Sequence, residues 1–369
     1  MTGMQNHALP MDFFICKTGC SHFTGKSPHM NRIATHAFYD AVKKNNLDLA
    51  ASLYKHCAPG MIDINATNAL GMSPLHHAAE YGNRKMVKFL IDVGANLDAR
   101  NMDEETPLNL CCHHETASII VNVLKRRKEL LEAAKMGNVT LAAKALADGG
   151  KINFPDPKGK TALHHAVHVR TSKTCTEQQR HNIVRFLLKN GANPNTITEE
   201  GTPLQTALGM NDIPMAGMLI TAGADIHNAN LHGTPTLFCA ASIAAFELLV
   251  AKGADPYTHD SLRRGMLHRT AEKGSLPLMQ HLMAKYGMQE LLNTPDALGR
   301  TPLYLAAKNK QVETIRFLIA QPGILYVAAD DGTTPAMTTN NKEVRALLKD
   351  MERAGAAPVL APACKPPGF

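Results

Sequence analysis

The sequence predicts an all-α solenoid built from helix-turn-helix repeats. One observation is a recurring motif in which Gly precedes Thr or Ser by one or two residues, with Pro-Leu or Ala-Leu following. Another is an apolar helical run that follows the motif and ends in Gly. The third is composition. Hydrophobic residues make up 44% of the chain, yet 5% are aromatic and Trp is absent, so Ala, Leu, Ile and Val must fill the core.

Each part of the motif has a local physical role. Thr or Ser caps the first helix, and Pro suits its first position because that N–H has no intrahelical partner. Small pairs such as Ala78 and Ala79 let helices approach closely. Gly after the second helix can adopt the left-handed conformation. The motif histidines can hydrogen-bond neighbouring repeat turns. The clearest copies are residues 71–79, 159–166, 201–207 and 299–307, and the motif histidines are His76, His164 and His268.

This pattern resembles the ankyrin repeat, which has a period of about 33 residues and a T-P-L-H-x-A core. The resemblance covers residues 36–355, or about ten repeats. It implies an all-α ankyrin-repeat solenoid of helix-turn-helix units with short β-hairpin fingers. It also implies a non-enzymatic protein that recognises other proteins.

The repeat spacing divides the chain into four segments. Residues 125–128 run directly into residues 129–134, where a finger is expected, so we predict an irregular junction near 125–131. The basic run 125–128 is interpreted as a helix end that complements the macrodipole. The predicted segments are a flexible leader (1–35), an N-terminal array of about three repeats (36–127), a C-terminal array of about seven repeats with an insertion near 168–181 (128–355), and a disordered Pro-rich tail (356–369).

Composition and charge exclude several classes of protein. The longest apolar run is about ten residues, whereas a membrane span needs about 20. The N-terminus lacks a basic region typical of a secretory signal. The eight Cys are irregularly spaced, which favours reduced thiols and a cytoplasmic location. A net charge of +7 favours acidic partners but argues against nucleic acid, so weak nucleic-acid or anionic-lipid binding stays an alternative.

Three clusters were weighed as chemical sites. The glycines Gly19 and Gly25 enclose five residues instead of the four of a phosphate-binding loop, so we predict no nucleotide site. A leader zinc site is a second alternative. In the third cluster, Cys111 and Cys112 are expected as a buried helical pair, and successive helical side chains diverge by about 100°. No enzyme, metal or cofactor is predicted, and a cryptic thiol or metal enzyme is the alternative. The two Cys-His clusters are Cys16, Cys20, His22 and His29, and Cys111, Cys112, His113 and His114.

The family resemblance places partner recognition on a concave face formed by first-helix ends and finger tips. Many of these positions are Lys, so we expect another protein with an acidic or phosphorylated segment as the partner. Exposed apolar residues there are the expected binding hot spots. The apolar candidates are Tyr81, Met136, Met210, Ile243 and Leu262. The polar candidates are Lys43, Lys44, His113, His114, Lys135, His168, Arg263, Arg264, Lys273 and Lys308.

The predicted function is a monomeric cytoplasmic scaffold or adaptor. Ankyrin proteins without attached domains also include effectors that intracellular bacteria deliver into host cells. The uneven repeats fit such an effector in a host cytoplasm and a eukaryotic adaptor alike, so both alternatives stay open.

Overall fold

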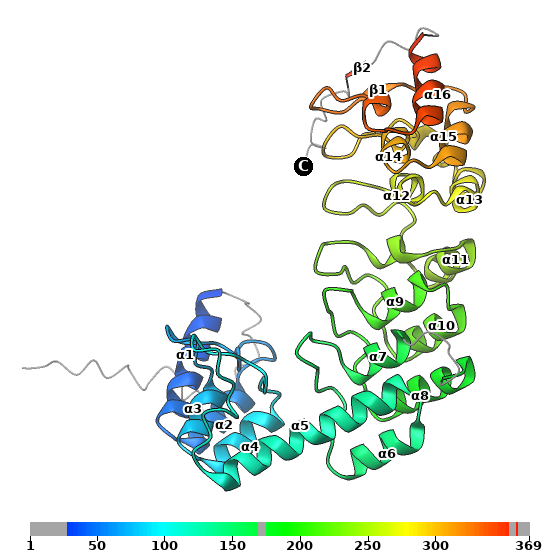
Figure 1. Ribbon diagram of the computed structural model, residues 1–369. Helices are drawn as coiled ribbons and strands as arrows, with labels where there is room; N and C mark the ends of the chain where they lie inside the picture. The colour runs from blue at the N-terminus through cyan, green and yellow to red at the C-terminus, as the bar shows by residue number, and fades with distance from the viewer. Residues whose placement is uncertain (1–27, 169–174, 354–358, 361–369) are drawn as a thin grey trace, which may run out of the picture. The chain divides into compact units, whose positions relative to one another are not determined.

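The computed structural model divides into two units, between Leu124 and Lys125 (Figure 1). It describes residues 28–168, 175–353 and 359–360. Within these residues, no helix has the length and apolar character that a membrane crossing needs. The alternatives placed on Cys16, Cys20, Gly19 and Gly25 lie outside the described residues.

Unit 1 begins with two helix pairs. Capping fixes where most of these helices start: the side chains of Asn46, Ser73 and Asn83 each accept a hydrogen bond from a backbone N–H in the first turn. Phe38, Leu75 and Leu90 are among the fully buried side chains between the helices. The expected leader overlaps the first helix, because that helix already begins at Pro28. The helices are α1 (Pro28–Lys43), α2 (Leu47–His56), α3 (Pro74–Glu80) and α4 (Arg84–Asp92).

The third repeat lacks a first helix. Residues 106–112 form turns, in which the Thr106 N–H donates to Asn109 Oδ1 at 2.9 Å. Such side-chain bonds compete with helical hydrogen bonding. Cys111 is half-buried and Cys112 is exposed, so the expectation of a buried helical Cys pair is wrong.

A single helix, α5 (His114–Lys135), replaces the predicted irregular junction. Residues 125–135 consist of strong helix formers without Gly or Pro, so the chain continues as a helix where other repeats form a finger. The basic run 125–128 therefore lies inside a helix rather than at its end. Within this run, Arg126 pairs with Glu129 at 3.0 Å and with Asp148 at 3.2 Å.

Unit 2 stacks helix pairs in chain order, with the loops between pairs projecting on one side (Figure 1). One buried apolar cluster extends from Leu130 to Leu348. The helices are α6 (Val139–Ala147), α7 (Ala162–His168), α8 (Glu177–Lys189), α9 (Pro203–Gly209), α10 (Ile213–Thr221), η2 (Thr236–Cys239), α11 (Ile243–Ala251), α12 (Met266–Lys273), α13 (Leu276–Tyr286), η3 (Met288–Leu291), α14 (Pro302–Lys308), α15 (Val312–Ile319), η4 (Pro335–Met337) and α16 (Lys342–Arg353).

Three repeats of unit 2 depart from the regular pair. In the fifth repeat the second helix, α8, has 13 residues, and Thr176 caps it with a capping box. Residues 169–174 of the predicted insertion lie outside the described residues. In the seventh and tenth repeats, the 3-10 turns η2 and η4 take the place of a first helix.

The fingers are built from turns rather than from regular hairpins. In the described residues, strand pairing is limited to β1 (Val327–Ala328) with β2 (Val359–Leu360) and two isolated bridges. The strand β2 lies in the tail that was expected to be disordered, and the rest of that tail lies outside the described residues. Neighbouring fingers are joined by backbone hydrogen bonds, such as Ala297 N–H to the Leu262 carbonyl at 2.8 Å.

Candidate partner-binding surface

The finger tips share one hydrogen-bonding pattern. An Asn or Asp begins each turn, and its Oδ1 accepts from the backbone N–H groups two and four residues later, at 2.8 to 3.0 Å. The residue three positions on has a positive φ, which favours Gly. The exceptions are Glu104, with φ 60°, and Arg263, with φ 58°. The capping residues are Asn68, Asn101, Asp156, Asn230, Asp260 and Asp296.

The motif histidines hold each first helix to the following finger. Nδ1 of His164 accepts from the Thr161 N–H at 3.2 Å, and Nε2 donates to the Thr196 carbonyl at 3.1 Å. His76 makes the same two bonds, so the predicted role of these histidines is confirmed. Burial lowers the pKa of His164 to about 4, which keeps its ring neutral at pH 7.

The same role passes to other residue types in later repeats. Gln205 Nε2 donates to the Asn228 carbonyl at 3.3 Å, and the Tyr304 hydroxyl bonds Thr333 Oγ1 at 2.9 Å. Sequence reasoning missed both because it followed only histidine. Their position three residues after the capping Thr was the available signal.

Nine of the candidate binding residues share one location. Each lies at the last position of a first helix or in the turn that follows, and each side chain is exposed. Lys273 and Lys308 make no ion pair with any described residue, whereas Lys135 pairs with Glu132 at 2.8 Å. The nine are Lys43, Lys44, Tyr81, Lys135, Met136, His168, Met210, Lys273 and Lys308.

Three further candidates lie elsewhere than expected. His113 precedes α5 and His114 begins it, because the third repeat has no first helix; both are exposed. Ile243 is the first residue of α11, a second helix, and is half-buried against the core. Its expected place at a first-helix end is wrong because η2 ends early, at Cys239.

The remaining candidates occupy one finger. Leu262 and Arg263 are exposed in its turn. The Arg264 side chain is held inward, with Nε donating to Asp260 Oδ2 at 2.7 Å and a further ion pair to Glu272 at 3.6 Å. Arg264 therefore positions the finger more than it presents charge.

A polar cluster that sequence reasoning missed lies beside the first-helix ends of the fourth and fifth repeats. His165 Nε2 lies 2.9 Å from Asp156 Oδ2, and Lys160 Nζ lies 2.6 Å from Glu200 Oε1. Burial lowers the pKa of His165 although Asp156 opposes the change. The Lys160 hydrogen bond lowers the pKa of Glu200. His168 stands 3.9 Å from the same carboxylate, so the cluster offers donors in a fixed arrangement.

The corresponding place in unit 1 is aromatic. The Tyr39 hydroxyl donates to the Met72 carbonyl at 2.9 Å and lies 2.8 Å from His77 Nε2. Burial, with the nearby Asp40, raises the pKa of Tyr39 to about 12. The Tyr81 ring stacks on His77 with an interplanar angle of 15° and is 57% exposed. Tyr81 therefore presents a rigid aromatic face to solvent.

One cluster has the composition of a metal site. Glu177, His181 and Asp212 bring ligand atoms within 4.8 Å of one another. The Asp212 carboxylate, however, already binds the Arg180 guanidinium and accepts from the Met215 N–H at 3.0 Å as the cap of α10. A guanidinium in direct contact repels a cation, so we assign this cluster to structure.

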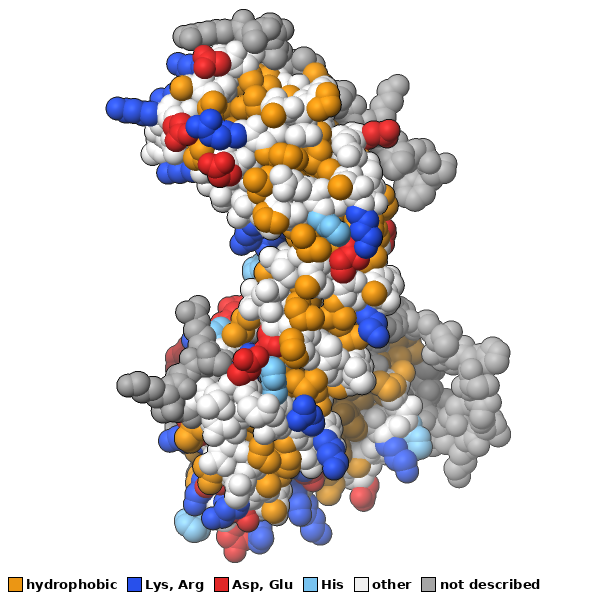
Figure 2. All heavy atoms as spheres, turned by 90° about the vertical axis from the view of Figure 1, so that its right-hand side faces the viewer, with side chains coloured by type: hydrophobic (Ala, Val, Ile, Leu, Met, Phe, Trp, Pro, Cys, Tyr) orange, Lys and Arg blue, Asp and Glu red, His pale blue; other side chains and the backbone are white. Residues whose placement is uncertain are grey.

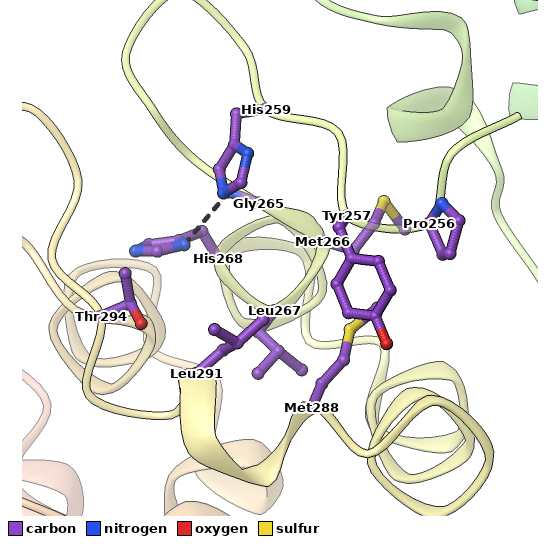
Figure 3. A pocket seen from close by; sticks show the side chains of 10 residues that line it. All are labelled: Pro256, Tyr257, His259, Gly265, Met266, Leu267, His268, Met288, Leu291 and Thr294. Carbon is purple, nitrogen blue, oxygen red and sulfur yellow. Dashed lines mark hydrogen bonds between the residues drawn. The ribbon is translucent and has the colours of Figure 1, made fainter. Parts of the chain in front are cut away.

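A small pocket lies beneath the finger that precedes α12 (Figure 3). Its walls include Met266, Leu267 and Met288, and the Gly265 N–H donates to His268 Nδ1 at 3.3 Å. The space holds about one water molecule, which is far below the several hundred Å³ of a typical ligand pocket. Burial lowers the pKa of His268 to about 4, as expected for a structural histidine.

Comparisons with known proteins agree with this architecture. The family profile described as "Ankyrin repeats (3 copies)" matches residues 38–129, 237–330 and 267–354, and the profile "Ankyrin repeat" matches residues 158–199.

Three curated proteins illustrate the similarity. The mouse B-cell lymphoma 3 protein homolog is 26% identical over 58% of this chain and 50% of its own length. The chicken nuclear factor NF-kappa-B p105 subunit is 24% identical over 66% of this chain and 26% of its own. An L-asparaginase of Dirofilaria immitis is 26% identical over 50% of this chain and 32% of its own. The chain thus spans half or less of the length of these relatives.

Proposed function

The chain belongs to the ankyrin-repeat family, and on this premise we propose that it is a protein-binding scaffold or adaptor without catalytic activity. The observation that carries the proposal is the shared, exposed location of nine candidate residues at first-helix ends. Fixed polar side chains and well-capped fingers surround them in unit 2 and provide a preorganised surface. Preorganisation favours affinity because little ordering entropy is lost on binding.

The partner that suits this surface is a protein segment rich in acidic or phosphorylated side chains. Lys273 and Lys308 are exposed and make no ion pair with described residues, so their charges are available. Met136, at 45% exposure, and Met210, at 39%, offer apolar anchors between charged neighbours. Such a mixture of Met with cationic rims is typical of binding surfaces.

Charge reversal at Lys273 and Lys308 tests this surface. We expect the double variant Lys273→Glu/Lys308→Glu to lose capture of partners by the full chain and to bind phosphoserine-rich probe peptides at least about ten-fold more weakly. The thermal unfolding midpoint should stay unchanged because both side chains are exposed. The matched control is Lys349→Glu, an exposed position on α16. Equal capture by the wild type and the double variant at physiological salt would disprove this binding surface.

The alternative of a thiol enzyme finds little support in the thiols. Burial raises the pKa of Cys57, Cys111, Cys175 and Cys239, which keeps these groups protonated and poorly nucleophilic. Labelling of the native protein with a thiol reagent should therefore proceed slowly at these four positions. A hyper-reactive Cys would revive the enzymatic alternative.

We also retain as proposals a monomeric state and action in the cytoplasm, as an adaptor of the cell that makes the protein or as an effector delivered into a host cell. Light scattering of the purified chain measures the first. Imaging of the tagged chain in its own cell, and in host cells exposed to it, measures the second.

A further inference from the structure

The outer face of α10 and α11 differs from the other second helices of unit 2. The helix α10 carries no charged side chain, and α11 carries only Glu247, whereas α8, α13, α15 and α16 carry several. Figure 2 looks onto this side of unit 2, where hydrophobic side chains reach the surface.

The buried side of each helix defines the outer residues. Met215, Ala216 and Leu219 of α10 are fully buried. At 100° per residue, Pro214, Gly217 and Thr221 therefore lie on the opposite side. On α11 the corresponding residues are Ala244, Leu248 and Ala251, and Leu248 packs partly against the core. The outer face is thus a strip of small and apolar side chains.

Gly217 gives this strip a feature that the fold itself does not require. Gly in a helix interior costs about 0.5–1 kcal/mol relative to Ala. A Cβ at position 217 would have no neighbour within 4 Å, so no internal contact demands Gly there. Close approach by the backbone of another molecule would demand it.

Cationic side chains line one edge of the strip, near the C-terminal ends of the second helices. Lys189 and Lys252 are exposed and make no ion pair with described residues. The only acid of the strip, Glu247, is neutralised by Lys285 at 2.5 Å and His281 at 2.7 Å. The charge that this edge presents is therefore positive.

We propose that the outer face of α10 and α11 is a second docking surface, separate from the first-helix ends, and that it takes an amphipathic helix of another protein. The apolar face of that helix would lie on the small-residue strip, with Gly217 allowing close backbone approach. Acidic side chains along one edge of the helix would meet Lys189 and Lys252.

Two synthetic peptides test the proposal with the full chain. One is a helix of about five turns with Leu on one face and Glu along one edge, and the other has Lys in place of Glu. Fluorescence anisotropy should show the Glu peptide binding about ten-fold more tightly. A photoreactive residue on its Leu face should crosslink to α10 or α11.

Three variants make the test specific. Gly217→Leu fills the strip and should weaken binding about ten-fold, while Gly217→Ala should weaken it less and raise the thermal unfolding midpoint. Lys189→Glu/Lys252→Glu should abolish the preference for the Glu peptide. The control Lys349→Glu should change neither property. Circular dichroism of each variant confirms that it is folded.

Three outcomes would overturn the docking surface. One is equal binding of both peptides that Gly217→Leu leaves intact. Another is loss of peptide binding only in Lys273→Glu/Lys308→Glu, which would place the peptide on the first-helix ends and leave the proposed function standing. The last is a dimer in light scattering that Gly217→Leu dissociates, because a second copy would then cover this face.

Discussion

The fifth and seventh repeats of unit 2 perform the same packing task with different chemistry. The fifth has a complete first helix, α7, and contains two buried polar connections: His164 to the Thr196 carbonyl, and Arg180 to Asp212 at the start of α10. The seventh has only the 3-10 turn η2, followed by α11. Leu237, Phe238 and Phe246 fill its interior at 3% exposure or less.

The difference shows that a repeat can lose its first helix when large apolar side chains fill the space. Apolar packing is non-directional, so it tolerates a changed backbone. Polar connections need fixed donor and acceptor positions, and they cost more when one partner is removed. We therefore expect the fifth repeat to be more sensitive to single substitutions and to pH than the seventh.

The largest effect is expected from Asp212→Ala. The Arg180 side chain is 5% exposed, so removal of its carboxylate partner leaves a buried charge and should lower the free energy of unfolding by about 3–5 kcal/mol. Asp212→Asn keeps the helix cap and should recover about 1 kcal/mol of that loss. Urea unfolding followed by circular dichroism measures both. A loss below about 1 kcal/mol for Asp212→Ala would contradict the role assigned to this ion pair.

A pH effect of similar size is expected from His164. Because its folded pKa of about 4 lies below the ordinary 6.5, the unfolded chain binds the proton first as the pH falls. The stabilisation is complete above pH 6.5 and is lost between pH 6.5 and 4, by at most about 3 kcal/mol. His164→Gln, which copies Gln205 of the sixth repeat, should remove this part of the pH dependence. Unfolding curves that remain parallel for both proteins over this range would refute it.

The helix caps should give smaller and equal losses in the two repeats. Thr176 caps α8 and Ser242 caps α11, each by accepting from a backbone N–H at 3.2 Å. Thr176→Ala and Ser242→Ala should each lower the free energy of unfolding by about 1 kcal/mol. Equal values would show that the two repeats differ in their interiors rather than in their helix starts. Unequal values would shift the difference to the caps.

The smallest effect is expected in the fingers that follow the two repeats. The turn after α8 has Gly201 at φ 102°, whereas the turn after α11 has Arg263 at φ 58°. Arg263→Gly relieves a left-handed conformation and should raise the free energy of unfolding by about 1 kcal/mol or less. Gly201→Ala should lower it, because a Cβ there would stand 2.3 Å from Gln205 Oε1. Thermal unfolding measures both changes, and a loss of stability in Arg263→Gly would count against strain at this turn.

Local signals in the sequence predicted much of the fold. Capping Thr and Ser, Pro at the first helical position and Gly after second helices placed α3, α9 and α14 near their observed starts. The first-helix ends followed from the same register, so nine candidate binding residues lie at the expected position. The third and seventh repeats broke the register, which misplaced His113, His114 and Ile243.

The sequence by itself determined the repeat architecture, because capping residues, apolar periodicity and left-handed glycines act within a few residues of the chain. It also determined the role of the motif histidines, whose partners lie in the next repeat. Only the tertiary structure decided that α5 runs continuously, that Arg180 finds Asp212, and that Gln205 and Tyr304 replace histidine. These outcomes depend on which groups from different repeats meet in a buried space, and burial sets the energetic weight of every such meeting. The available charge at Lys273 and Lys308, set against the bound charge of Arg264, follows from the same physics.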